Sequence, residues 1–177
     1  MKKLLFLSMM FLMAIAIASC DKDSTGTGTS GGGSVITPAG DSVITPAGYV
    51  DLGLQSGTLW KDENENVFCD YDDAVSMFGS KLPTKKQWEE LKAFCEWTWT
   101  GNGYKVTGEN GNSIVLPAAG DRDCNGYVSD DVGSWGFYWS STHFGSDDAW
   151  CLYFYSGGVY VGYDFRCFGR SVRLVQD

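Results

Sequence analysis

The side chains best placed to do chemistry in this sequence are aromatic, and they gather near the C-terminus. Two apolar runs, residues 150–155 and 159–162, are joined by a turn at 156–158 and predict a hairpin. Successive side chains of a strand point to opposite faces, so one alternating set is expected in the core. This set comprises Trp150, Leu152, Phe154, Val159 and Val161. The opposite set comprises Cys151, Tyr153, Tyr155, Tyr160 and Gly162.

The second set predicts noncovalent recognition. A sheet face next to water is normally rich in Thr, Lys and Glu, whereas this face carries three tyrosines, followed closely by Tyr163, Phe165 and Phe168. Exposed aromatic patches generally mark binding sites. Tyr mixed with Ser, Gly, Asp and Arg is also the composition of antibody-like paratopes. The alternative is that the tyrosines form a second buried face in a sandwich, since aromatic residues favour strands.

The cysteines and the histidine offer little metal chemistry. No Cys-x-x-Cys motif is present, and His143 is the only histidine, so no zinc site is expected. Beyond Cys20, five cysteines remain, and this odd number leaves at least one unpaired. No pairing is assigned. These five are Cys69, Cys95, Cys124, Cys151 and Cys167.

The segment 121–126 (DRDCNG) matches the first half of an EF-hand loop, in which alternating oxygens bind calcium. The second half does not match the EF-hand pattern, because the twelfth position is Val132 rather than a bidentate Glu. Asp130 or Asp131 could substitute for that Glu as a calcium ligand. Neither a metal nor another cofactor is therefore expected.

Catalysis is not expected either. A nucleophilic thiol at Cys151 or Cys167 needs an adjacent base or a cationic setting, and the sequence shows no histidine partner. The carboxylate pairs at 130–131 and 147–148 are better explained as solvated loop residues, because nothing sets the separation that a glycosidase requires.

Two short helices are expected before the strands. Asp70 can cap the first, Gly79 can end it, and Ala74, Met77 and Phe78 share one face. The second opens at residues 83–84, where Thr84 and Gln87 form a capping box.

Trp88, Leu91 and Cys95 follow in the second helix at i, i+3 and i+7 and indicate its buried face. The segments 97–100, 104–107 and 113–116, separated by glycine turns, then predict a β-meander.

The N-terminal part indicates export and anchoring. Lys2 and Lys3 precede an apolar run at 4–17, which predicts a signal peptide at 1–19 and a lipid-modified Cys20 in a lipobox-like setting. The acidic residues at 21–23 resemble the signal that sends some Gram-negative lipoproteins outward. We therefore expect an outer-membrane lipoprotein that faces the exterior and contacts the membrane through Cys20.

A tether and one domain complete the expected organisation. Residues 20–48 are rich in Gly, Ser and Thr, repeat the sequence SVITPAG, and predict a flexible linker. Residues 49–177 have the usual length of a single domain. The net charge of -9 argues against nucleic acid as a partner.

The motifs of this domain resemble the Fibrobacter succinogenes major paralogous domain family. They are 49–54 (YVDLGL), 59–60 (LW), 81–84 (KLPT), 87–91 (QWEEL), 116–120 (LPAAG), 138–141 (YWSS) and 171–174 (SVRL). The resemblance implies an α+β, C-type-lectin-like fold of the formylglycine-generating-enzyme branch, with two short helices plus antiparallel sheets and hairpins. The sugar-binding tripeptides of calcium-dependent lectins are absent, so the fold does not by itself imply carbohydrate binding.

The final segment is also similar to the variable proteins of diversity-generating retroelements, in which selected codons are rewritten on a fixed framework; the resemblance implies that Leu152, Phe154 and Val172 belong to this framework. The resemblance implies that an unknown external protein or glycan binds at the rewritten positions. These ligand-binding residues would be Phe144, Asp148, Cys151, Tyr153, Tyr155, Gly158, Tyr160, Gly162, Tyr163, Asp164, Phe165, Phe168 and Arg170. Two alternatives are a non-diversified structural or adhesive envelope lipoprotein and a relic of the enzyme branch with a reactive thiol.

Overall fold

The computed structural model describes residues 45–177, which belong to one compact unit. The predicted signal peptide (1–19), the predicted lipidation site Cys20 and most of the predicted linker (20–48) lie outside the described residues. Within residues 45–177, no helix is both long enough and apolar enough to cross a membrane.

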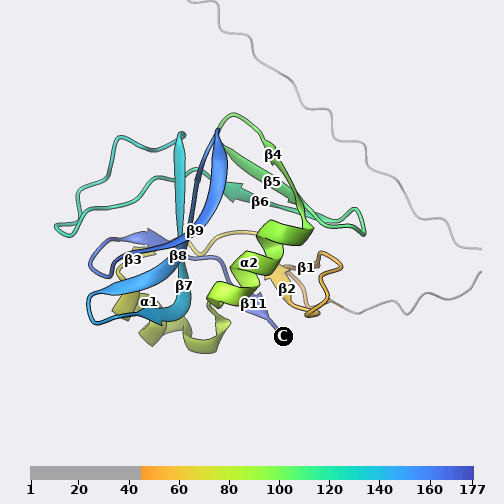
Figure 1. Ribbon diagram of the computed structural model, residues 1–177, viewed down its shortest axis with the longest axis horizontal. Helices are drawn as coiled ribbons and strands as arrows, with labels where there is room; N and C mark the ends of the chain where they lie inside the picture. Colours follow the sequence, from red (N-terminus) through yellow and green to blue (C-terminus); the bar gives the residue numbers. More distant parts are fainter. Residues whose placement is uncertain (1–44) are drawn as a thin grey trace, which may run out of the picture. The chain divides into compact units, whose positions relative to one another are not determined.

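The described chain is mixed α+β, as the sequence predicts (Figure 1). Its helices are α1 (Tyr71–Phe78), the 3-10 helix η1 (Gly79–Lys81) and α2 (Lys85–Phe94). A five-stranded sheet has the order β3-β10-β7-β8-β9. Its strands are β3 (Phe68–Cys69), β10 (Arg170–Ser171), β7 (Trp135–Phe144), β8 (Asp148–Tyr155) and β9 (Gly158–Phe165).

Two three-stranded sheets complete the fold. One, in the order β1-β2-β11, contains β1 (Tyr49–Asp51), β2 (Leu59–Lys61) and β11 (Val175–Gln176). The other is the predicted meander of β4 (Glu96–Trp99), β5 (Gly103–Thr107) and β6 (Ser113–Pro117). Strand pairing is antiparallel except between β10 and β7, which pair in parallel at Ser171 and Tyr138.

Both predicted helix starts are confirmed. The Asp70 carboxylate accepts the Asp73 N–H, and Thr84 and Gln87 form the reciprocal capping box. Of the three residues predicted to share one face of α1, Ala74 is buried, whereas Met77 is 59% exposed. An eight-residue helix that packs by one side has a narrow buried stripe, and Met77 lies outside it.

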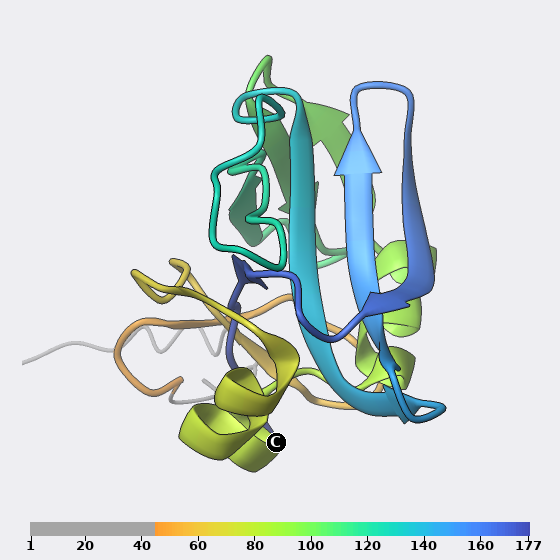
Figure 2. The same ribbon diagram turned by 90° about the vertical axis from the view of Figure 1, so that its left-hand side faces the viewer.

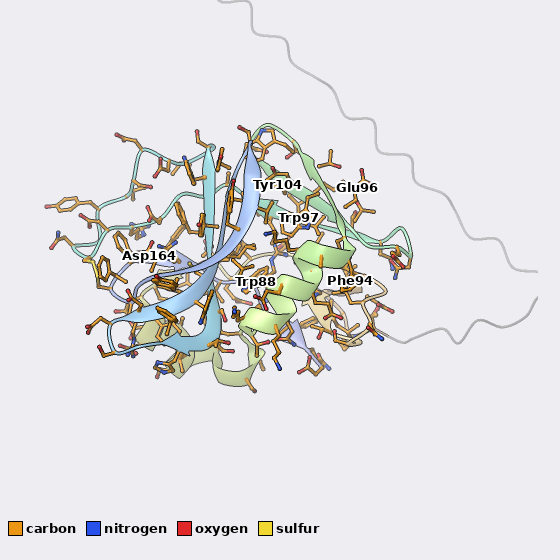
Figure 3. The ribbon with its side chains drawn as sticks, in the orientation of Figure 1. Trp88, Phe94, Glu96, Trp97, Tyr104 and Asp164 are labelled. Atoms are coloured by element: carbon orange, nitrogen blue, oxygen red, sulfur yellow. A yellow bond between two sulfur atoms is a disulfide. The ribbon has the colours of Figure 1, made fainter. Side chains whose placement is uncertain are left out.

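The five-stranded sheet separates two apolar clusters. Tyr138, Leu152 and Phe154 join the cluster that contains Trp88 of α2 and Tyr104 of the meander. Figure 3 shows Trp88 and Tyr104 on this side of the sheet.

The neighbours of these strand residues turn to the other side. Trp139 and Cys151 join the second cluster, with Tyr71 and Ala74 of α1. This division follows from the alternation of side chains along β7 and β8.

The connection from β9 to β10 has to cross β8 and β7, because the two strands it joins lie on opposite sides of that pair. In Figure 2 it passes in front of the sheet, on the side of α1 and opposite α2. A disulfide between Cys124 and Cys167 fixes it to the loop before β7. Arg122 and Gly169 reinforce this link by exchanging backbone hydrogen bonds of 2.8 and 2.9 Å.

Candidate ligand-binding surface

Five aromatic side chains from three adjacent strands share one side of the large sheet. The ladder pairs Trp135 with Tyr155 and Phe137 with Tyr153 between β7 and β8, and Tyr153 with Tyr160 between β8 and β9. Residues paired across an antiparallel ladder point to the same side, so these rings form one continuous patch, which we call the aromatic face. In Figure 2 the ends of β7, β8 and β9 that carry these residues form the upper part of the sheet, and no helix lies in front of them.

The tyrosine rings lie nearly parallel to one another. The centroids of Tyr153 and Tyr160 are 5.3 Å apart with 16° between the ring planes, and those of Tyr155 and Tyr160 are 6.1 Å apart with 10°. Trp135 extends the row, with its ring centroid 4.6 Å from that of Tyr155. The three tyrosines thus pack against one another as one continuous aromatic row.

Glycines allow the rings to lie close to the backbone. A Cβ atom added at Gly162 would lie 2.9 Å from the Tyr153 ring, and one at Gly158 would lie 2.8 Å from the Tyr160 hydroxyl oxygen. Either side chain would force the ring to shift. Two of the predicted ligand-binding positions are therefore glycines over which tyrosines lie.

The lower part of the same side is buried rather than exposed. Trp139 and Cys151 are 0% and 1% exposed, and the ring of Tyr71 from α1 lies 5.5 Å from that of Trp139. The upper part remains accessible, with Tyr160 38% exposed and Tyr153 and Tyr155 half-buried. The predicted recognition surface and its alternative, a buried second face, thus describe different parts of one sheet surface.

A buried cation lies at the border between these two parts. The Arg170 side chain is 1% exposed and donates from Nη2 to Oδ2 of Asp164 over 2.6 Å. Its guanidinium carbon lies 4.7 Å from the Phe137 ring centroid, 5.0 Å from that of Trp139 and 5.6 Å from that of Phe168. Cation–π attraction therefore complements the single ion pair.

Arg170 nevertheless keeps unused hydrogen-bonding capacity. Its Nε and Nη1 atoms are buried and have no hydrogen-bond partner among the described residues. A buried guanidinium with unpaired donors is costly, so this position favours an added acceptor. Asp164, which is 40% exposed in its side chain, lies on the side of the sheet opposite Trp88 (Figure 3).

The structure divides the predicted site residues between the two sides of the sheet. Tyr163 pairs with Trp150, so it lies on the side of Leu152 and α2, away from Tyr160. Its ring stacks on Phe144 with centroids 3.9 Å apart, and Lys85 Nζ lies 3.9 Å from the Trp150 ring centroid. Tyr163 and Phe144 thus form a second aromatic cluster, separate from the aromatic face.

The other predicted positions lie near the end of β9 or beneath the rings. Phe165 is 57% exposed, pairs with Asp148 in the ladder, and has its ring centroid 6.5 Å from that of Phe168. Cys151 and Arg170 are buried, so neither is offered directly at the surface.

The unpaired thiols lie in apolar surroundings. Burial raises the pKa of Cys69, Cys95 and Cys151 to about 11 in each case. At Cys151 the positive charge of Arg170 works in the opposite direction but is the weaker effect. These three thiols are therefore protonated at neutral pH, which disfavours nucleophilic chemistry.

The calcium-like segment is organised as a turn. Asp123 Oδ1 accepts the N–H groups of Asn125 and Tyr127, both over 2.9 Å. The hydrogen bond from Tyr127 is the main cause that lowers the pKa of Asp123. Within residues 45–177, no group of three or more His, Cys, Asp or Glu side chains is arranged to hold a metal ion.

A polar hollow of about 390 Å³ lies at the end of β8 and β9 opposite the aromatic face. Asp70, Asp72, Ser146, Asp147, Phe165, Arg166 and Cys167 line it. Asp72 and Arg166 form an ion pair with each other. The charges of this hollow are thus partly satisfied within the chain.

Sequence reasoning missed Trp135 and Phe137, which supply the β7 part of the aromatic face. Their alternation with Gly136 and Tyr138 is a strand signal, but the sequence does not show that this strand lies next to β8. The position of Tyr163 could have been found, since period-two counting from Val159 and Val161 assigns it to their side.

Comparison with known proteins adds a partial match. A family model described as a domain of unknown function (DUF8237) matches residues 96–175. This segment includes all five rings of the aromatic face, together with Asp164 and Arg170. No curated protein and no solved structure matches the chain.

Proposed function

We propose that this domain binds an external ligand through the aromatic face. The observation that carries the proposal is the accessible row of half-buried Tyr153 and Tyr155 and exposed Tyr160, continued by Trp135 and Phe137 on the part of the sheet that no helix covers (Figure 2). Tyrosine and tryptophan are among the residues that most often dominate the binding energy at interfaces. Truncating one such side chain can cost about 2 kcal/mol or more of binding free energy.

The face suits a ligand with a flat, weakly polar surface and an adjoining charge. The parallel rings supply apolar contact area, and their hydroxyl groups supply donors and acceptors at its margin. At the lower border the Asp164 carboxylate is partly exposed, whereas its ion-pair partner Arg170 is buried, so selection for the charge of the ligand would act through Asp164. Catalysis forms no part of this proposal.

The proposal extends to the framework that carries the face. The motif resemblance supports a C-type-lectin-like domain similar to retroelement variable proteins. Framework residues implied by that resemblance, such as Leu152, Phe154 and Val172, are buried here, whereas Tyr153, Tyr155 and Tyr160 lie on the aromatic face. The positions implied to vary occupy both sides of the sheet, so diversification would alter the second aromatic cluster as well.

Sequencing the surrounding locus tests the diversification. The expected result is a near-copy of the last forty or so codons beside a reverse transcriptase, with mismatches at adenines of the copy and at the positions named above. Without such a copy, diversification is rejected, and ligand binding by the aromatic face is then tested on its own.

The proposed location is the outer surface of the outer membrane, with lipid attached at Cys20. The support is the order of a basic start, an apolar run and a small-residue junction before Cys20. Mass spectrometry of protein from the native membrane should find the first nineteen residues removed and acyl chains on Cys20. An unmodified N-terminus would refute the anchor.

Ligand binding itself can be tested with arrays of glycans and of extracellular protein domains. The test variant carries Tyr153→Ala, Tyr155→Ala and Tyr160→Ala, and the matched control carries Tyr163→Ala. Tyr163 is more exposed than Tyr160, at 54% against 38%, but lies on the other side of the sheet. Loss of array binding in the triple variant with retention in the control supports the aromatic face, whereas equal binding by both refutes it.

A further inference from the structure

The outer edge of β9 is open along most of its length. In the five-stranded sheet β9 is a terminal strand, and its only ladder is with β8. In Figure 2 it forms the right-hand border of the sheet. At eight residues it is much longer than β3, the two-residue strand that forms the opposite border.

Hydrogen bonds identify which residues of β9 turn their backbone outward. The Phe165 N–H donates to the Asp164 side chain over 2.8 Å, and its carbonyl accepts from Phe168 N–H, so Phe165 does not bond to β8. Arg166 N–H, one residue later, donates across to Asp147. Because outward and inward residues alternate in an antiparallel ladder, Val159, Val161 and Tyr163 also turn outward.

Within residues 45–177, the backbone groups of these three residues have no hydrogen-bond partner. The strand itself contains neither proline nor lysine, two residues that commonly block an edge. Its single charge, Asp164, is engaged with Arg170 and with the Phe165 N–H.

A hollow of about 330 Å³ runs beside this edge and is lined by Val161 together with Glu89, Lys92 and Ala93 of α2. Glu89 forms an ion pair of 3.2 Å with Lys85. Lys92 has no ion-pair partner among the described residues and lies 5.9 Å from the Tyr160 ring centroid. The hollow thus offers one unpaired positive charge next to apolar surface.

We propose that the β9 edge binds an extended peptide segment of a partner protein as an added strand. The unpaired backbone of Val159, Val161 and Tyr163 is complementary to the backbone of an extended segment. Alternate side chains of the added strand would enter the hollow against Val161, where Lys92 favours an acidic side chain. The intervening side chains would lie beside Tyr160.

This inference goes beyond ligand binding by the aromatic face and does not rest on it. The added strand is held by backbone groups, which alanine substitution of the tyrosines leaves in place. Failure of one proposal can therefore be distinguished from failure of the other.

The test uses two synthetic peptides of about eight residues, the length of β9, that alternate Val and Thr and carry one central Glu or one central Lys. Amide exchange of the protein is measured by NMR with each peptide. We expect the Glu peptide to slow exchange at Val159, Val161 and Tyr163, and to bind about threefold more tightly than the Lys peptide, in keeping with one exposed charge pair.

Two variants locate the contact. Val161→Pro removes one outward N–H and should weaken binding about tenfold, whereas Val161→Thr keeps the N–H and the branched shape and should bind as before. Lys92→Glu leaves the backbone intact and should reverse the preference between the two peptides, which keeps the proposal testable if Val161→Pro does not fold.

Two results would overturn the proposal. The first is unchanged exchange at the three amides with either peptide. The second is protection of the same amides in the absence of peptide as the protein concentration rises, because the edge would then pair with a second copy of this chain.

Discussion

Arg170 and Asp164 form an ion pair at the lower border of the aromatic face, with Nη2 and Oδ2 2.6 Å apart. The arginine is buried, whereas the aspartate is 40% exposed in its side chain. This pairing connects two positions that the sequence assigns separately to ligand contact. It also joins the end of β9 to the start of β10, so a change at either residue affects how the connection lies across the sheet.

Replacing Asp164 with alanine should destabilise the fold by about 2 kcal/mol. The loss leaves a buried guanidinium without its ion-pair partner, although the partial exposure of Asp164 lets water replace some of the interaction. Asp164→Asn retains an acceptor and should cost less. Denaturant unfolding measures both changes. If Asp164→Ala unfolds at the wild-type midpoint, the pair does not support the fold.

Aromatic residues on the two sides of β8 and β9 should respond differently to truncation. Phe154 is fully buried, so Phe154→Ala should cost about 3–5 kcal/mol through lost burial and a cavity. Tyr160 is 38% exposed, so Tyr160→Ala should cost roughly 1 kcal/mol or less. The comparison is made by thermal unfolding of the two variants. A cost at Tyr160 similar to that at Phe154 would mean that this tyrosine belongs to the core.

The three unpaired cysteines should react slowly with alkylating reagents at neutral pH. Since burial raises the pKa of Cys69, Cys95 and Cys151 to about 11, labelling of the folded protein by iodoacetamide should stay slow at neutral pH and accelerate as pH approaches that value. Mass spectrometry of peptides from the folded and the unfolded protein gives the rate at each site. Rapid labelling of Cys151 at neutral pH would instead favour the enzyme-branch alternative.

Tyr138 should make the fold sensitive to alkali. Burial raises its pKa to about 12, above the value of about 10 expected in the unfolded chain. Its contribution to stability is therefore fully present below pH about 10 and is lost as pH rises through about 12. Tyr138→Phe lacks this group and should lose less stability over that interval.

The same variant should be less stable at neutral pH by about 1 kcal/mol, because the Tyr138 hydroxyl donates to the Pro117 carbonyl over 2.7 Å. Denaturant unfolding across the pH range, for both proteins in parallel, measures the difference. Identical pH profiles would show that Tyr138 is not responsible.

Reducing the disulfide should destabilise the fold and loosen the loop before β7. Cys124 and Cys167 are 43 residues apart in sequence, and closing a loop of that length contributes about 4 kcal/mol in the chain-entropy account. Cys124→Ser should therefore lower the unfolding free energy by up to roughly that amount and increase amide exchange near Arg122. If exchange at Arg122 does not change, the backbone bonds with Gly169 suffice to hold the loop.

Local sequence signals predicted much of the fold. Asp70 and Thr84 mark helix starts because their side chains bond to backbone groups only a few residues away. The alternation around Leu152 and Phe154 predicted the buried side of the hairpin because two-residue periodicity is a property of one strand. Such signals need no knowledge of distant contacts.

The rest depends on contacts between distant segments. Trp135 joins Tyr155 only because β7 pairs with β8, and Arg170 is buried only because the connection after β9 crosses the sheet. Phe144 follows an irregularity in the β7–β8 register between Trp139 and His143, so counting along β7 does not place it.

Recognition by the aromatic face is tested by measuring binding and unfolding on the same preparations of wild-type protein and the triple tyrosine variant. An array ligand of the wild type is titrated against both proteins, and both are then unfolded thermally. We expect the variant to lose affinity by about a hundredfold or more while it retains cooperative unfolding. Unchanged affinity, or a variant that no longer folds, would contradict the claim that Tyr153, Tyr155 and Tyr160 form a recognition surface.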